Sequence, residues 1–224
     1  MLAKRTASAT VSGGLAGRQY FPDDAELLFQ EALARNEHRD LQGAEKCLLR
    51  LIDGQDQALF ASVDVGLRSY KARHNLAVIV QGQGRLAEAE AQWRHALTEQ
   101  PDYLPALLGL AELYLIQSRL ADVERIIKQL ESIPSTFVWR LVVRARLDMA
   151  QQDFSAARRT LEEAVVSSPD EILLWIVLSH ALLQEGKNWP AAEQVLRRIL
   201  ELDPDNSEAK TNLAKLTHHL AGAC

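Results

Sequence analysis

One sequence pattern recurs about every 34 residues along this 224-residue chain, and it constrains the fold more than any other feature. Its clearest copy, residues 70–103, has a large–small residue pair in a first helical segment, a glycine turn, a small–aromatic–small face in a second segment, and a closing proline. These positions are Leu76, Ala77, Gly84, Ala89, Trp93, Ala96 and Pro101. Because one such helix pair cannot close its own core, pairs of this kind pack on their neighbours in an array. The pattern therefore predicts an all-α fold.

The same register predicts five repeats within a single array over residues 25–222. Their ranges are 25–58, 70–103, 104–137, 138–171 and 172–206, with an insert at 59–69 and a cap helix at 207–222. Asn206 or Ser207 is expected to cap that last helix, because short polar side chains accept hydrogen bonds from the first free N–H groups.

The pattern resembles the tetratricopeptide repeat, which is marked by the same large, small and aromatic positions and a terminal proline. The resemblance implies an α-solenoid: a right-handed superhelix of antiparallel helix pairs, closed here by a C-terminal cap helix. It also implies protein binding rather than catalysis.

A second resemblance lies in the segment SVDVGLRSYKARHNLAV, residues 62–78. It is similar to repeat regions that accompany family 2 glycosyltransferases in some bacteria, and so implies an association with such a system. With Ser62 as a helix cap and Asp64 in the first turn, the insert is expected to lengthen the first helix of the second repeat. Gly66 would then lie inside a helix.

The N-terminal residues divide into a flexible leader, 1–16, and a remnant end of an upstream repeat, 17–24. Pro22 stands where Pro101 closes its own repeat, so we expect the chain to be, or to descend from, the C-terminal part of a longer repeat protein. A native leader with a short capping helix is the alternative. Under truncation, Leu27, Leu28 and part of Phe29 are expected to be exposed. Copies of the chain should then either associate through the first repeat or fray from that end.

Composition and charge exclude several classes of partner and compartment. The net charge of −5 gives no electrostatic reason to bind nucleic acid. The most apolar run, residues 171–183, is shorter than the roughly 20 residues of a membrane helix, so no membrane insertion is expected. Cys47 and Cys224 are the two cysteines and form no disulfide framework, which favours a cytoplasmic location.

The chain carries no phosphate-binding, metalloprotease or nucleophile-elbow motif. Adjacent histidines at 218 and 219 point about 100° apart on a helix, so they are expected to be exposed rather than to bind a metal. Cys47 is expected to be a small buried hydrophobe. We predict no catalytic residue, no metal and no cofactor, and hence no enzyme within this chain.

The family resemblance implies that the first helix of each repeat lines a concave binding wall. By register, the predicted partner-binding residues are Phe29, Leu33, Lys71, His74, Asn75, Val78, Leu108, Glu112, Trp139, Val142, Arg146, Met149, Ile176, His180 and Lys215. The mixture of apolar and charged side chains suits a peptide or an amphipathic helix. The alternative for Phe29, Leu33, Val142 and Ile176 is packing between neighbouring helices.

Three hypotheses about function follow. The first is a non-catalytic scaffold that binds a protein or peptide and is associated with a glycosyltransferase system. The second is the C-terminal repeat part of a larger family 2 glycosyltransferase. The third is a self-assembling structural module.

Overall fold

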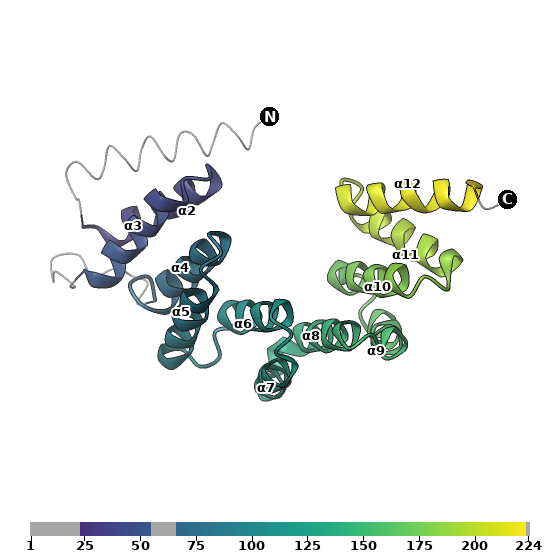
Figure 1. The fold of residues 1–224 in the computed structure, drawn as a ribbon, viewed down its shortest axis with the longest axis horizontal. Coiled ribbons are helices and arrows are strands. Elements are labelled where there is room, and N and C mark those ends of the chain that lie inside the picture. Colours follow the sequence, from purple (N-terminus) through teal and green to yellow (C-terminus); the bar gives the residue numbers. More distant parts are fainter. Residues whose placement is uncertain (1–22, 55–65, 223–224) are drawn as a thin grey trace. The chain divides into compact units, whose positions relative to one another are not determined.

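The computed structural model describes residues 23–54 and 66–222. This part of the chain forms eleven α-helices in sequential antiparallel pairs, with no strand (Figure 1). They are α2 (Ala25–Glu37), α3 (Leu41–Asp53), α4 (Tyr70–Gly82), α5 (Leu86–Glu99), α6 (Leu104–Ile116), α7 (Leu120–Glu131), α8 (Phe137–Ala150), α9 (Phe154–Ser167), α10 (Ile172–Glu185), α11 (Trp189–Leu202) and α12 (Ser207–Gly222), with a 3-10 turn, η1 (Pro134–Thr136), before α8. The predicted all-α fold is confirmed; the right-handed superhelix stays a prediction.

The chain divides into two compact units, with the boundary between Leu113 and Tyr114 inside α6. The N-terminal unit holds α2 to α5 and most of α6. The C-terminal unit holds the end of α6 and α7 to α12. In both units we call the first helix of a pair the A helix (α2, α4, α6, α8, α10) and the second the B helix; α12 stands in the place of a sixth A helix. The predicted repeat and domain bounds themselves stay predictions.

A left-handed backbone residue separates the two helices of every pair. Positive φ angles occur among the described residues at Arg39, Gly84, Ser118, Gln152 and Gly186. From Gly84 onward these residues are spaced by 34 positions, the period of the sequence pattern; Arg39 precedes Gly84 by that period plus the eleven residues of the insert. The backbone thus repeats the same turn even where the sequence has no glycine.

Small residues occupy one fully buried position of the B helices. Ala44, Ala89, Ala157 and Ala192 occupy the same position in four B helices, and each is 0% exposed. An alanine lets two helix backbones approach closely, and the larger neighbours then fill the space between pairs. Their burial agrees with the small-residue position of the repeat pattern.

Polar caps fix the ends of the array's described part. The side chain of Asp24 accepts a hydrogen bond from the N–H of Leu27 at 2.9 Å and starts α2. Asn206, one of the two predicted caps, accepts from the N–H of Ala209 at 2.9 Å and starts α12.

The leader, the segment around Pro22, and Ser62 with Asp64 lie outside the described residues. The expected exposure of Leu28 is wrong, since its side chain is 0% exposed.

The predicted extension of the helix over Gly66 is also wrong. Residues 66–69 form turns, and α4 begins only at Tyr70. A Cβ atom on Gly66 would lie 2.5 Å from the Cζ atom of the Tyr70 ring. The Tyr70 ring in turn packs edge-on against Tyr103, with 4.7 Å between the ring centroids. Gly66 is therefore required by a close contact in a turn, not tolerated within a helix.

We therefore expect Gly66→Ala to destabilise the protein by about 1–3 kcal/mol, because the added methyl group overpacks against a held aromatic ring. A glycine inside a helix would behave in the opposite way, with alanine raising stability by about 0.5–1 kcal/mol. Urea unfolding of the two proteins measures the difference, and a more stable variant would contradict the turn contact.

The left-handed turns allow a second test with a matched control. We expect Gly84→Ala to cost about 1–2 kcal/mol, because an L-residue is disfavoured at a φ of +80° even though no atom lies within 4 Å of the new Cβ. Gly82→Ala, at the end of α4, is expected to leave stability unchanged or raise it, since its Cβ would meet only Leu41 at an ordinary 3.9 Å. Equal melting temperatures for both variants would argue against the turn.

Candidate protein-binding surface

The A helices carry the residues predicted to bind a partner. In the structure the half-buried members are Phe29, Leu33, Lys71, His74, Asn75, Leu108, Trp139, Arg146, Met149, Ile176 and His180, and the exposed members are Val78, Glu112 and Lys215. The predicted set therefore retains fourteen surface positions, which we call the A-helix face and describe separately for each unit. Whether they bind a partner stays a prediction.

Val142 does not belong to this face. Its side chain is 2% exposed and lies in the hydrophobic core of the C-terminal unit, together with Val177 and Ala181 of α10. The alternative of packing between neighbouring helices therefore applies here, and a partner cannot reach Val142 without unfolding the core.

An aromatic cluster supports the face in the N-terminal unit. His74 of α4 packs edge-on against Tyr103, with ring centroids 5.7 Å apart, and the Trp93 indole N–H donates a hydrogen bond to its Nδ1 atom at 3.1 Å. Trp93 is 1% exposed, so this bond joins a buried B-helix residue to the A-helix face. Because Nδ1 accepts, it carries no proton, and His74 is held in one tautomer.

The same surroundings oppose protonation of His74. Burial lowers the pKa of its imidazole below the ordinary value of 6.5. A second proton, on Nδ1, would also face the Trp93 N–H donor. His74 is thus a neutral hydrogen-bonding group at neutral pH rather than the cation that the sequence allows.

Two neighbours of His74 are partly engaged within their own helix. The amide of Asn75 donates to the Lys71 carbonyl oxygen at 2.9 Å, one turn earlier. The Lys71 ammonium lies 6.0 Å from the centre of the Tyr70 ring, at the outer limit of a cation–π contact. This part of the face is aromatic and polar, with little net positive charge.

The face of the C-terminal unit has a different character. Arg146 of α8 is half-buried and forms no ion pair or hydrogen bond within the described residues, with apolar Met149 one turn further along its helix. Arg144, two residues earlier, instead forms a bidentate pair with Glu124 of α7 at 2.6 and 3.0 Å. Of these two arginines, the one on the A-helix face is left without an anionic partner.

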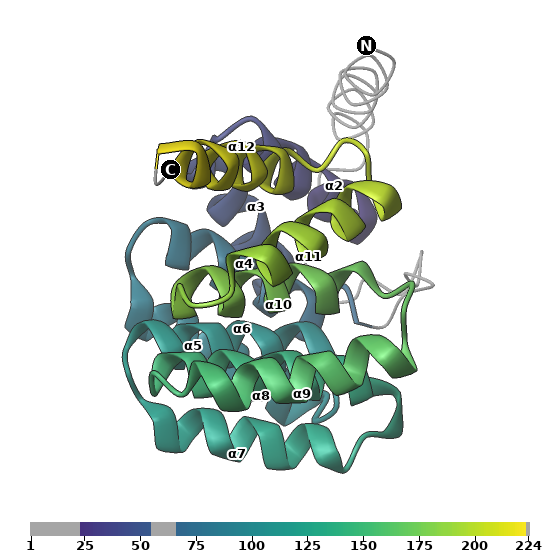
Figure 2. The same ribbon diagram turned by 90° about the vertical axis from the view of Figure 1, so that its right-hand side faces the viewer.

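A polar contact links two A helices of this unit. The Nε2 atom of His180 in α10 lies 2.9 Å from a carboxylate oxygen of Glu208 in α12. Figure 2 shows α8, α10 and α12 one above another in this unit. The contact shows that equivalent faces of successive A helices adjoin.

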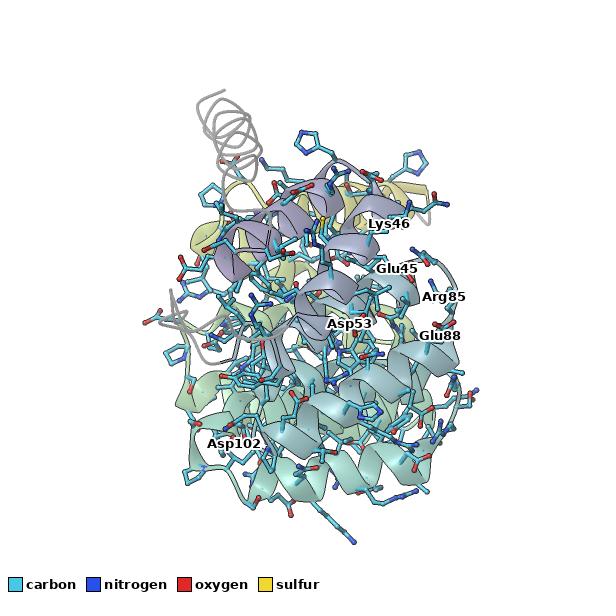
Figure 3. The ribbon with its side chains drawn as sticks, turned by 90° about the vertical axis from the view of Figure 1, so that its left-hand side faces the viewer. Glu45, Lys46, Asp53, Arg85, Glu88 and Asp102 are labelled. Atoms are coloured by element: carbon cyan, nitrogen blue, oxygen red, sulfur yellow. The ribbon has the colours of Figure 1, made fainter. Side chains whose placement is uncertain are left out.

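The sequence patterns did not predict the charged network that joins the first two repeats. Arg85, at the start of α5, donates to Glu45 of α3 at 2.7 Å and to Glu88 at 2.7 Å (Figure 3). The hydrogen bond from Arg85 also holds the pKa of Glu88 below its usual value. The i,i+3 spacing of Arg85 and Glu88 could have predicted the ion pair between these two residues, since Arg119 and Asp122 repeat it 34 residues later.

An open depression of about 430 Å³ lies beside this network, between α2 and α3. Three of its charged groups satisfy one another: Arg35 pairs with Glu31 at 2.8 Å and with Asp40 at 2.5 Å. The Gly43 N–H and Arg35 lower the pKa of Asp40. Since these groups already have partners, the depression has the features of a structural ion-pair cluster rather than of a ligand site.

Two negative findings limit the chemistry of the described residues. No group of three or more histidine, cysteine or acidic side chains among them is placed to hold a metal ion. None of the helices within 23–54 and 66–222 has both the length and the apolar composition to cross a membrane. Cys47 is 7% exposed, as expected for a small buried hydrophobe.

Comparison with known proteins identifies the repeat type in two stretches of the chain. Models of the tetratricopeptide repeat match residues 71–98 and 148–216. These two stretches are tetratricopeptide repeats. A thermophilic tetratricopeptide-repeat protein of Thermus thermophilus matches its structure with a TM-score of 0.68 at 15% identity, over 87% of this chain and 99% of that one. A tetratricopeptide-repeat protein of Parabacteroides merdae gives a TM-score of 0.67 at 15% identity, over 97% and 94%. These likenesses show the fold alone.

The chain also has a distant similarity to curated bacterial proteins. Cellulose synthase operon protein C of Xanthomonas axonopodis pv. citri is 30% identical over 153 residues, which are 60% of this chain and 10% of that protein. The protein of the same name from Komagataeibacter xylinus is 28% identical over 117 residues, which are 51% of this chain and 9% of that protein. The chain spans about a tenth of the length of these relatives.

The burial of His74 predicts a pH dependence of stability. The unfolded chain binds a proton with the ordinary histidine pKa and the folded chain with a lower one, so the free energy of unfolding should fall as the pH falls through and below 6.5. We expect a smaller fall in His74→Gln, whose amide oxygen can still accept from Trp93. His95→Gln, on the exposed surface of α5, is the control. Urea unfolding between pH 8 and 5 measures the free energy of unfolding at each pH. If this free energy falls equally with pH in wild type and in His74→Gln, the lowered pKa of His74 is refuted.

Proposed function

We propose that this protein is a non-catalytic scaffold that binds a segment of a partner protein on its A-helix face. The observation that carries the proposal is Arg146, a half-buried cation on that face with no anionic partner in the described residues. Partial burial disfavours a charged group unless another group compensates it. An anionic group of a partner would supply that compensation, while Trp139 and Met149 on the same helix would supply apolar contact area.

We further propose that the scaffold serves a polysaccharide-synthesis system. Two observations support this proposal: the similarity to proteins named cellulose synthase operon protein C, and the segment 62–78, which resembles repeat regions beside family 2 glycosyltransferases. Tetratricopeptide repeats are typically non-catalytic, so the scaffold would bind a component of such a system rather than transfer sugar itself.

A second candidate is the repeat part of a larger protein of that system. The specific observation in its favour is that the aligned region is about a tenth of the length of the curated relatives. In this case the same face would bind a segment of its own polypeptide or of an assembled partner. The two candidates share one binding surface, so one experiment tests both.

The experiment selects ligands from random sequences, because the repeat pattern does not specify the sequence of the partner. A library of random peptides displayed on phage is panned against the immobilised protein, and the affinity of selected peptides is measured by fluorescence anisotropy. We expect the double variant Trp139→Ala, Arg146→Ala to bind them at least about tenfold more weakly, the loss of roughly 1.4 kcal/mol.

The control is Arg159→Ala, because Arg159 is exposed on the B helix α9 and forms no ion pair in the described part of the chain. Its affinity should equal that of wild type. Thermal unfolding of all variants verifies that they are folded. A library that yields no binder, or binders unaffected by the double variant, would refute the proposed binding face.

A further inference from the structure

Three basic residues occupy one repeat position in the C-terminal unit. Arg146 of α8, His180 of α10 and Lys215 of α12 are separated by 34 and 35 residues, and the extra residue lies in the turn after Gly186. The residues that precede the first two, Ala145 and Ser179, are both buried, which shows that the two helices present equivalent faces. We call Arg146, His180 and Lys215 the basic ladder.

The basic ladder is specific to this unit. The equivalent positions of α2, α4 and α6 hold Leu33, Val78 and Glu112, which are apolar or acidic. The repeat pattern that builds the scaffold therefore does not require a basic residue here. Three successive basic residues are better explained by a ligand than by the fold.

The polar groups of the ladder are available to an anion: Arg146 and Lys215 are cations, and the imidazole of His180 is a hydrogen-bonding group. Arg146 and Lys215 form no ion pair within residues 23–54 and 66–222, and His180 contacts only the exposed carboxylate of Glu208 in the same part of the chain. The carboxylate of Glu208 thus lies beside His180, the middle residue of the ladder, where a carboxylate of a ligand would bind. Half-buried apolar residues, Ile176 and Leu183 of α10, lie on the same helix as His180.

The spacing of the ladder defines the shape of its ligand. Helices in contact lie about 8–10 Å apart, and α8 contacts α10 while His180 of α10 reaches Glu208 of α12. A polyproline II segment rises about 3.1 Å per residue with three residues per turn, so every third side chain returns to one face after about 9 Å. A β-strand alternates sides at every residue and does not place every third side chain on one face.

We propose that α8, α10 and α12 bind an acidic segment of a partner protein in the polyproline II conformation, with a carboxylate at every third residue. The segment crosses the three helices, and its successive carboxylates meet Arg146, His180 and Lys215. On binding, its middle carboxylate displaces Glu208 from His180. This inference rests on the proposed scaffold function and names the class of partner.

The test uses three synthetic peptides with a fluorescent label. The probe contains three Glu-Pro-Pro units, in which proline favours the required conformation. Three Gln-Pro-Pro units remove the charge, and three Glu-Pro-Pro-Pro units keep the charge but change the spacing. Fluorescence anisotropy at low and at physiological salt should show binding of the probe that is at least about fivefold tighter than that of either control peptide, the effect of roughly 1 kcal/mol.

Variants of the protein provide an internal check in both directions. Arg146→Ala and Lys215→Ala should each weaken probe binding about threefold to fivefold, in line with the loss of one partly exposed ion pair. Glu208→Gln should tighten it, because the competing carboxylate is neutralised and His180 is freed. Arg159→Ala should have no effect. The far-ultraviolet circular dichroism of each variant verifies that it is folded.

The proposal would be refuted if the two charged peptides bound with equal affinity. It would also be refuted if an oligothymidylate of similar charge bound as tightly as the probe. A Glu208→Gln variant that binds more weakly than wild type would refute it as well. If library-selected peptides bind the A-helix face but the acidic probe does not, the ladder is wrong and the scaffold function stands. If neither the library nor the probe yields binding, both are wrong.

Discussion

The left-handed residue between the two helices of each pair is the constraint on which the rest of the structure depends. Only two of the five residues with this conformation are glycines, although an L-residue there costs about 1–2 kcal/mol. Arg39, Ser118 and Gln152 adopt it without the freedom of a glycine, so the rest of the structure must offset the cost of the conformation. The turn returns the chain so that the second helix packs on the first, and an alanine such as Ala89 or Ala157 is fully buried where a larger side chain would need more space.

A turn repeated at a constant interval separates the residues that build the scaffold from those free to specify a partner. Buried positions recur with similar residues, as Ala145 and Ser179 do in α8 and α10. Positions one residue further on face outward and change their chemistry, from Val78 in one repeat to Arg146 in another. Function in such an array therefore depends on a small number of outward residues whose spacing the fold has already determined.

The same distinction explains what the sequence could predict. The 34-residue period was sufficient for the helix pairs and the buried alanines, and the residue types narrowed the cap of α12 to Asn206 or Ser207, because each of these features depends on residues of one repeat. It was insufficient for Gly66 against Tyr70, for the burial of Val142 against α10, and for the bond from Trp93 to His74. These features depend on the size and orientation of side chains that meet across a turn or between helices, which periodicity does not report.

The overall charge of the chain limits which anion the C-terminal unit can select. With 30 acidic and 25 basic residues, the protein repels an anion at long range, and this repulsion extends over a Debye length of about 8 Å at physiological salt. A long polyanion would place most of its charge beyond Arg146, His180 and Lys215, on a protein whose net charge is −5. A short segment with three spaced carboxylates would instead place every charge beside a basic residue. The balance of general repulsion and local attraction therefore favours a short acidic segment with regularly spaced carboxylates over a nucleic acid. Selectivity then depends on the geometry of the three basic residues rather than on their number.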